Sequence, residues 1–430
     1  MVALIFDCEH LFHARSAYHE GVLPIELAEA CVDWLGDDQD ALYACARVCR
    51  AWLPRAYSHR FRRLRYGGLA PCPGYSPPQA TSLVRLLDYF EENDRVCTFV
   101  RELHLKTRRE RLQLNVFRRL LSYFPYLAVC ELDSAILNSF TSTFTYPRCP
   151  YIPRSLQILK LRAPRVLKEH TQLHEILELF RSIDDLRICL PTPHPSTAEI
   201  ERRGGTRRQP GLKVARLTLD SRFPRTAVRA LQQLPFVLDQ TSLRTLSCPA
   251  FGAHTLDPTA LELFLRDCGA SLTELDVGDA AREADSPLPL HACPAIAMLS
   301  LTVPLPVGSE LHGPSFNGGW NTLCAMLWSA PPSLQELRLT LDPVGDCKAS
   351  PEGIHARECL VALDGLDWSA VDKYLRGRSR GSPHVLRLRI VNRGLESAST
   401  FLLVARQLLE EKFTTRVRHH VQYAVVSPLM

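Results

Sequence analysis

One short pattern recurs along most of this chain: a strand-like stretch in which leucines alternate with other residues. One central aliphatic residue marks each stretch: Leu103, Leu132, Leu159, Ile188, Leu217, Leu246, Leu275, Leu299, Leu337 and Leu388. By subtraction, the first seven are 29, 27, 29, 29, 29 and 29 residues apart, and the later intervals are 24, 38 and 51 residues. Apolar residues at every second position are typical of a β-strand with one buried face. A nearly fixed interval indicates stacked units that each contribute one strand.

Helical stretches fill the intervals between these strands. They are predicted at residues 117–124, 174–183, 226–234, 259–268 and 322–329. One strand and one helix cannot bury their apolar faces alone, so neighbouring units must stack. A period near 28 residues with a leucine-alternating strand is typical of leucine-rich repeats. We therefore expect an α/β fold in which residues 82–430 form a solenoid of this type, with a curved parallel sheet and helices on its convex side.

The remaining segments follow from composition. Four insertions in the later repeats are rich in proline, glycine, serine or charge and are predicted to be surface loops: 191–211, 279–295, 303–319 and 343–358. A proline- and glycine-rich stretch at 66–81 is a predicted linker. It follows a helical segment at 22–65 and an N-terminal segment at 1–21.

Two short helices are predicted within residues 22–65. Pro24 can begin the first, because the first turn of a helix needs no amide donor there, and Gly36 can end it. Pro54 is expected to end the second. Apolar residues at helical spacing mark one face of each helix: Leu27, Ala30, Cys31, Trp34 and Leu35, then Leu42, Cys45, Val48, Cys49 and Trp52. So short a unit rarely builds a sufficient core alone. Spacing leaves open whether the rest of this chain or a separate protein covers these faces.

The order of particular residues in this hairpin resembles the F-box. The matching motifs are Leu23-Pro24-x-Glu26-Leu27, Leu35 at the end of the first helix, and Val48-Cys49-Arg50-x-Trp52. The flanking residues look like the F-box of the large fungal F-box families. The resemblance implies that the hairpin binds a small Skp-type adaptor, which in turn binds the cullin of a ubiquitin ligase. It also implies which residues face the adaptor or support that face: Leu23, Pro24, Leu27, Leu35, Val48, Cys49 and Trp52.

This resemblance leads to a functional hypothesis and two alternatives. The hypothesis is the substrate-recognition adaptor of a Skp–cullin–F-box ubiquitin ligase, in which the solenoid binds a protein target and thereby raises its effective concentration. One alternative is an F-box scaffold that acts outside a ligase. The other is a plain protein-interaction solenoid whose hairpin is an N-terminal cap.

Sequence motifs for catalysis are missing from the chain. It has no phosphate-binding G-x-x-x-x-G-K-[ST] loop, no G-x-G-x-x-G turn and no G-x-S-x-G nucleophile elbow. Cys8, His10 and His13 have no second ligand pair at zinc spacing. We therefore expect a non-catalytic protein without a cofactor or a metal.

Charge and hydropathy restrict the partners further. No apolar run approaches the eighteen or so residues that a membrane span needs, and residues 1–20 lack the basic start of a signal peptide. The expected location is the cytoplasm or nucleus, where the fifteen cysteines are reduced thiols. The net charge is +5, and arginine clusters at 60–65, 101–111 and 202–208 are not interleaved with stacking aromatics. Neither nucleic acid nor membrane is an expected partner.

Overall fold

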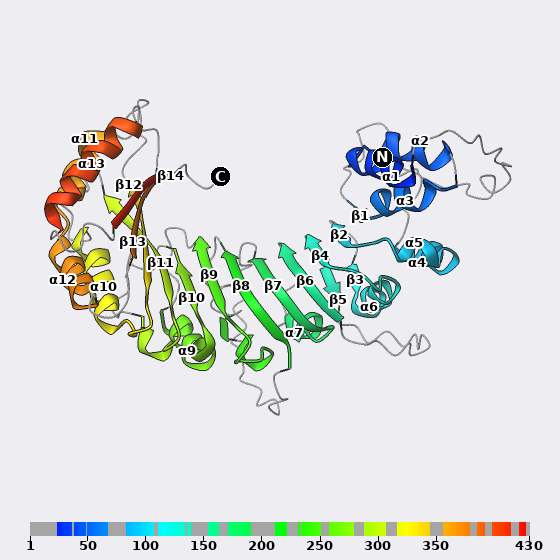
Figure 1. Ribbon diagram of the computed structural model, residues 1–430. Coiled ribbons are helices and arrows are strands. Elements are labelled where there is room, and N and C mark those ends of the chain that lie inside the picture. Colours follow the sequence, from blue (N-terminus) through cyan, green and yellow to red (C-terminus); the bar gives the residue numbers. More distant parts are fainter. Residues whose placement is uncertain are drawn as a thin grey trace, which may run out of the picture. The chain divides into compact units, whose positions relative to one another are not determined.

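The computed structural model of the protein is shown in Figure 1. It describes residues 24–36, 38–48, 50–67, 83–106, 111–133, 136–138, 154–162, 171–190, 211–221, 231–232, 234–250, 258–278, 288–306, 316–344, 356–378, 385–391, 398–413 and 421–426. The chain divides into two compact units, residues 1–180 and 181–430.

Three helices begin the first unit: α1 (Ile25–Trp34), α2 (Gln39–Val48) and α3 (Leu53–Arg60). As expected, Pro24 precedes α1 and its carbonyl accepts hydrogen bonds from the amides of Leu27 and Ala28, both at 3.0 Å. Gly36 follows the helix with a φ of 51°, a conformation that glycine adopts without strain. The predicted role of Pro54 is wrong, because α2 already ends at Val48 and Pro54 lies in the first turn of α3. Proline costs nothing there, since that amide has no helical acceptor.

The three helices share a small core. Its buried members are Val32, Leu42, Ala46 and Ala56, and its partly buried members are Leu35, Cys45, Trp52, Leu53 and Tyr57. Both α1 and α2 pack on α3, which is therefore the central helix of the three.

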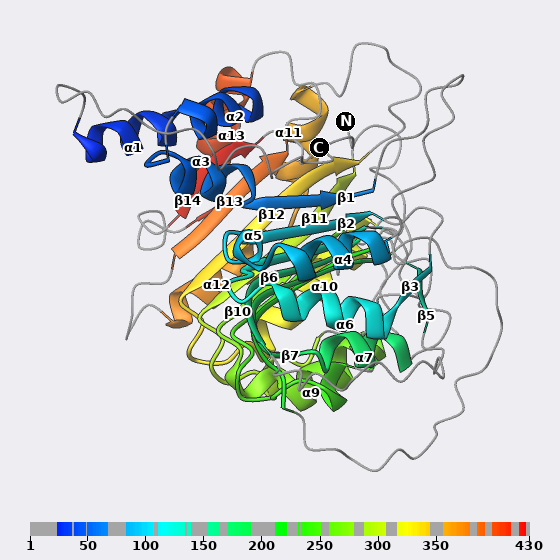
Figure 2. The same cartoon turned by 90° about the vertical axis from the view of Figure 1, so that its right-hand side faces the viewer.

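A parallel sheet follows the helices in the first unit. Its strands in the described residues are β1 (Arg63–Tyr66), β2 (Glu102–Lys106), β4 (Val129–Asp133) and β6 (Arg154–Arg162), each hydrogen-bonded to the next. The repeat helices of this unit are α4 (Leu83–Glu92), α5 (Asp94–Cys97), α6 (Leu114–Tyr123) and α7 (Thr171–Leu177). Two further short strands, β3 (Arg111–Gln113) and β5 (Ile136–Asn138), pair separately. Figure 2 shows α4 and α6 side by side, and Phe90 of α4 packs edge-on against Phe124.

Strand β1 was not expected from the sequence. It begins three residues after α3 ends and pairs with β2, with Leu64 opposite Leu103. The predicted boundary between a hairpin at 22–65 and a linker at 66–81 therefore falls inside a strand. Residues 68–82, most of that predicted linker, lie outside the described residues.

The second unit continues the same alternation with eight described strands in chain order. They are β7 (Phe180–Leu190), β8 (Lys213–Ser221), β9 (Thr245–Ala250), β10 (Glu274–Val277), β11 (Met298–Pro306), β12 (Glu336–Val344), β13 (Val385–Val391) and β14 (Val421–Val426). Every pair of neighbours is parallel. The intervening helices are η2 (Leu234–Phe236), α9 (Pro258–Cys268), η3 (Gly269–Ser271), η4 (Leu290–Ala292), α10 (Phe316–Ser329), α11 (Ala356–Asp364), α12 (Trp368–Arg378) and α13 (Ala398–Lys412).

The predicted repeat architecture is confirmed by strand order and burial. Within each unit, the described strands of the main sheet follow one another in parallel, and the ten marker residues are each at most 2% exposed. Within the second unit Leu217, Leu246, Leu275, Leu299 and Leu337 form one row across neighbouring strands. The described part of the chain is thus an α/β, leucine-rich-repeat-like array with buried leucines at alternate strand positions.

The register corrects three of the marker residues. Leu103 lies opposite Cys130, not Leu132; Leu217 lies opposite Leu186, not Ile188; and Leu337 lies opposite Leu386, not Leu388. The misplaced markers are Leu132, Ile188 and Leu388, and each lies two residues too far along its strand. A shift by two residues keeps a side chain on the same face, so alternation alone cannot detect it.

The described ends of three predicted loops belong to regular elements. Residues 191–210, 279–287, 307–315 and 345–355 lie outside the described residues. Their predicted flanks belong to regular elements instead: β11 extends to Pro306, α10 begins at Phe316, β12 extends to Val344 and α11 begins at Ala356. Proline and glycine near these ends had suggested loops, but β11 accommodates Pro304 and Pro306 within its pairing with β12.

Serine side chains bind three repeats of the second unit to the repeat before them. In Ser-Leu-x-x-Leu segments of the second unit, the serine directly precedes the first leucine. The Ser271 hydroxyl lies 2.8 Å from the Leu243 carbonyl, and the Ser333 hydroxyl lies 2.7 Å from the Ile296 carbonyl, which they can donate to. The Ser242 hydroxyl accepts from the Val214 amide at 3.0 Å. These contacts satisfy backbone groups that the sheet ladder leaves unpaired.

Candidate partner-binding surface

Helix α1 carries apolar side chains on two opposite sides. Ala28 and Val32, which are 2% and 1% exposed, face the three-helix core. Leu27 and Trp34 are 53% and 90% exposed. At 100° per residue, both lie roughly opposite Val32 on the helix. An exposed leucine and tryptophan on one helix face are a typical feature of a protein-binding surface.

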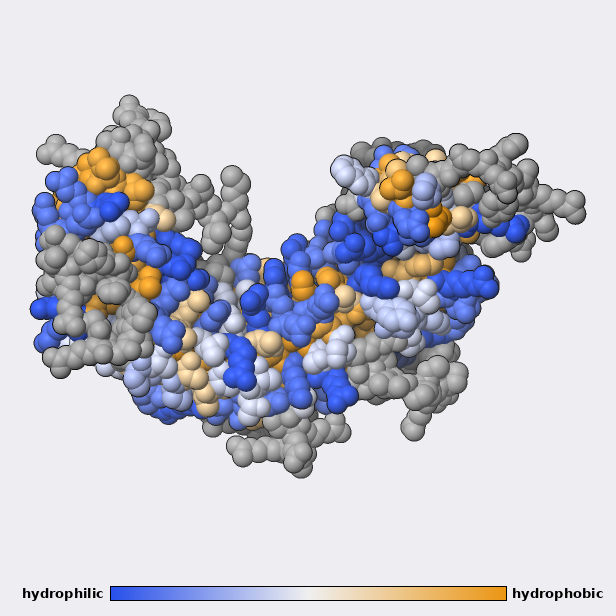
Figure 3. All heavy atoms as spheres, in the orientation of Figure 1, coloured by the Kyte–Doolittle hydropathy of each residue, from blue (hydrophilic) through white to orange (hydrophobic). Residues whose placement is uncertain are grey.

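The predicted adaptor-binding residues fall into three groups. Pro24, Leu27 and Val48 are exposed, with Val48 at 64%. Leu35 and Trp52 are partly buried and pack on the three-helix core, so they support the unit from inside. Leu23 and Cys49 lie outside the described residues. Figure 3 shows hydrophobic surface on these N-terminal helices and also on α11 and α13.

The predicted adaptor-binding residues did not include Trp34. Spacing grouped Leu27, Ala30, Cys31, Trp34 and Leu35 on one face and left its cover open, and the structure exposes all of them except Leu35, which is partly buried. The inward face carries Ala28 and Val32, whose spacing of four also fits a helix. A helix with two apolar stripes gives no indication in its periodicity of which one is buried.

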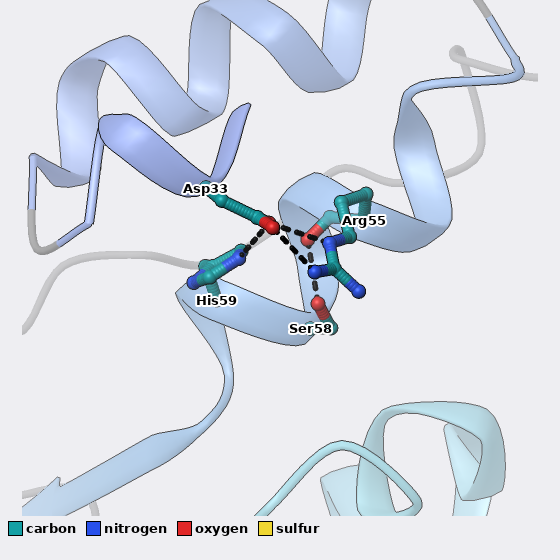
Figure 4. A network of polar contacts seen from close by, with 4 residues as sticks. All are labelled: Asp33, Arg55, Ser58 and His59. Carbon is teal, nitrogen blue, oxygen red and sulfur yellow. Dashed lines mark hydrogen bonds and ion pairs between the residues drawn. The ribbon is translucent and has the colours of Figure 1, made fainter. Parts of the chain in front are cut away.

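An ion cluster at the inner side of α1 joins it to α3 (Figure 4). The guanidinium of Arg55 donates from Nε to Asp33 Oδ1 and from Nη2 to Asp33 Oδ2, both at 2.5 Å. His59 Nε2 lies 2.7 Å from Asp33 Oδ1, and Ser58 Oγ donates to the Arg55 carbonyl at 2.7 Å. The hydrogen bonds from Arg55, and next that with His59, lower the pKa of Asp33 from 3.8 to about 2. The same carboxylate raises the pKa of Arg55.

The exposed strand face of the repeats differs in character from these helices. On the strand face opposite the buried leucines, charges of opposite sign pair with each other. In the first unit Arg63 contacts Glu102 at 2.8 Å and Lys106 contacts Asp133 at 2.9 Å. In the second unit Glu336 contacts Arg338 at 2.6 Å and Arg387 at 3.0 Å. In these pairs, each charge is offset by one of opposite sign within 3.0 Å.

Several thiols in the described residues are buried, whereas that of Cys31 is exposed. No group of three or more His, Cys, Asp or Glu side chains there could hold a metal ion. Burial raises the pKa of Cys97 to about 11 and raises that of Cys130 further, so neither thiol is a nucleophile at neutral pH. The metal candidates Cys8, His10 and His13 lie outside the described residues. None of the described helices is long and apolar enough to cross a membrane.

No family model matches the sequence, and no curated protein matches it. Among solved structures, the chain is similar to the leucine-rich repeat-containing protein LegL7 from Legionella pneumophila, with 12% identity and a TM-score of 0.38. The match covers 85% of this chain and 90% of that one. The repeat assignment therefore rests on the register and burial of the strands themselves.

Proposed function

We propose that this protein is the substrate-recognition subunit of a Skp–cullin–F-box ubiquitin ligase. In this proposal the three N-terminal helices bind a Skp-type adaptor, and through it a cullin, while the repeat array binds a protein target. The observation that carries the proposal is that Leu27 and Val48, at positions that match the F-box, are exposed on short helices. The unit's own core does not need these side chains.

Energetics favour a partner for this surface. Burial of a leucine or valine side chain contributes about 1.5–3 kcal/mol, which exposed side chains do not provide. Trp34 adds a large aromatic ring to the same side of α1 as Leu27. Tryptophan is enriched among the residues that dominate protein–protein interfaces. We therefore include Trp34 in the adaptor-binding surface, together with Pro24, Leu27 and Val48.

Leu27→Asp and Val48→Asp test the proposal in the full-length chain. Both positions are exposed, so the helices should fold, while a charge in an apolar contact should raise the dissociation constant for purified Skp-type adaptor at least tenfold. Leu403→Asp on α13 is the matched control, since Leu403 is also an exposed leucine, at 69%. Calorimetry measures the affinity, and circular dichroism checks the fold. The proposal fails if the unaltered chain does not bind adaptor or if all three variants bind it equally.

Strand β1 favours a second candidate function. Because β1 joins the helices to the sheet three residues after α3 ends, the helices can also act as an N-terminal cap of a protein-interaction solenoid. In that case Leu27→Asp should leave every partner in place. Copurification with a cullin would separate a ligase subunit from an F-box scaffold that binds the adaptor alone.

A further inference from the structure

The cluster around Asp33 has a role beyond stability in this unit. We propose that Asp33, Arg55 and His59 form a clamp that fixes the rotation of α1 about its axis and so orients Leu27 and Trp34 toward the partner. These three are positioning residues: they contact α1 and α3, not the partner. The inference rests on the proposed binding function of the helices, and it deepens that function.

Apolar packing alone determines the rotation of α1 poorly. The helix packs mainly against α3, its own buried side chains are Ala28 and Val32, and Leu35 directly after it is only partly buried on the core. Both are small and present few atoms for interlocking with a neighbour. Dispersion contacts are weak individually and depend on many atoms in register. A small, smooth contact therefore permits a helix to roll without a large loss of packing.

The ion cluster supplies the missing directional constraint. Arg55 meets both carboxylate oxygens of Asp33 through two separate nitrogens, and His59 approaches one of the same oxygens. A two-point guanidinium–carboxylate contact fixes the relative orientation of its partners as well as their distance. Arg55 and His59 are four residues apart on α3, so they hold the carboxylate from one face of a single helix.

The position of Asp33 connects this constraint with the exposed surface. Asp33 immediately precedes Trp34, and consecutive helical side chains are 100° apart. A roll of α1 by one residue's angle would carry Trp34 toward the position that Asp33 now occupies. With the clamp closed, Trp34 remains 90% exposed while Val32 remains 1% exposed. The contact that holds Asp33 against α3 therefore also determines the direction of its exposed neighbour, Trp34.

Hydrogen exchange of the full-length chain tests the clamp without a partner. Arg55→Met removes the guanidinium but keeps an unbranched side chain, and Arg55→Lys keeps the charge but not the two-point contact. Arg65→Met on β1 is the matched control, because it removes an arginine outside the helices. We expect Arg55→Met to speed exchange of the α1 amides at least tenfold while the α2 amides change less than twofold. In Arg55→Lys, the exchange rate of the α1 amides should lie between those of Arg55→Met and the unaltered chain. Arg65→Met should change the exchange rate of neither helix.

Adaptor binding by the same variants completes the test. Purified Skp-type adaptor should bind Arg55→Met about three- to tenfold more weakly and Arg65→Met as tightly as the unaltered chain. The clamp is overturned if α1 exchange does not change, or if α1 and α2 lose protection together, since Arg55 would then support the whole unit. Weaker adaptor binding with unchanged α1 exchange would also overturn it, because Arg55 would then contact the adaptor itself. Failure of the unaltered chain to bind adaptor would refute the ligase function, and α1 exchange would still decide the clamp.

Discussion

Gly67→Ala, which adds one methyl group, should strongly lower the stability of the sheet around β1. Gly67 directly follows β1 with a φ of 83°, and a Cβ atom added there would lie 1.8 Å from the carbonyl oxygen of Lys106 on β2. A non-glycine residue in this backbone region costs about 1–2 kcal/mol. The overlap involves backbone, which cannot move aside as a flexible side chain can, and overpacking of this kind costs about 1–3 kcal/mol. Gly67→Ala should therefore cost about 2–5 kcal/mol.

The cost should appear where β1 joins the sheet. The amides of Arg101 and Glu102 both donate to the Arg62 carbonyl at 2.9 Å, so their hydrogen exchange reports whether this junction opens. A loss of about 2–5 kcal/mol corresponds to exchange roughly 30- to 3,000-fold faster, since each 1.4 kcal/mol is a factor of ten. Amides of β9–β13 in the second unit should not change.

Substitutions at two other glycines separate the cost of the positive φ from the cost of the steric overlap with Lys106. Gly36 has a φ of 51°, and no atom lies within 4 Å of an added Cβ, so Gly36→Ala should show the backbone cost alone, about 1–2 kcal/mol. Gly377 lies in α12 with equally free space, so Gly377→Ala should stabilise that helix by up to about 1 kcal/mol. The reasoning is refuted if Gly67→Ala costs no more than Gly36→Ala, because the close approach to Lys106 would then have no energetic effect.

Two further predictions concern hydrogen bonds described above. Ser271→Ala removes the hydroxyl next to the Leu243 and Gln240 carbonyls and should lower the free energy of unfolding of the second unit by about 1–2 kcal/mol in urea titrations; Ser271→Thr, which keeps a hydroxyl, should recover part of it, and an equal loss in both would contradict the bonding role. Because the pKa of Asp33 is lowered from 3.8 to about 2, the stability that its pairing gives is present above about pH 4 and is lost as the pH falls toward 2. Asp33→Asn should therefore have a less stable α1 than the unaltered chain at pH 6 but a similar one at pH 2, as measured by helix-resolved NMR. If the difference in α1 stability is as large at pH 2 as at pH 6, the pairing of Asp33 is not its source.

Much of the repeat architecture could be predicted from the sequence, because alternating leucines define both the strand and its buried face. The exact register could not. Leu103 pairs with Cys130 while Leu132 lies two residues further on, and both side chains face the core, so spacing fits either. Strand β1 was missed because Arg63 and Arg65 flank its one leucine, which leaves too short a pattern to recognise.

The candidate surface was predicted less completely for two physical reasons. Large apolar residues such as Trp34 are expected inside, but α1 buries Ala28 and Val32 instead. The partner of Asp33 is also not evident from local sequence, because Arg55 is 22 residues away and reaches it only once α1 and α3 pack. Leu27 and Val48, which the F-box resemblance implies as adaptor-binding residues, are exposed, and it remains a proposal that they bind an adaptor.

Strand β1 also determines how this protein should be shortened for experiments. It is the first strand in the sheet order, and its arginines Arg63 and Arg65 place charge along that edge. Charged edge strands discourage edge-to-edge aggregation of sheets. A deletion of residues 22–65 would remove most of this charged edge strand. The β2 backbone, next to buried Leu103 and Leu105, could then pair with other molecules. A cut after Phe61 keeps β1, so that loss of a partner can be attributed to the helices and not to aggregation.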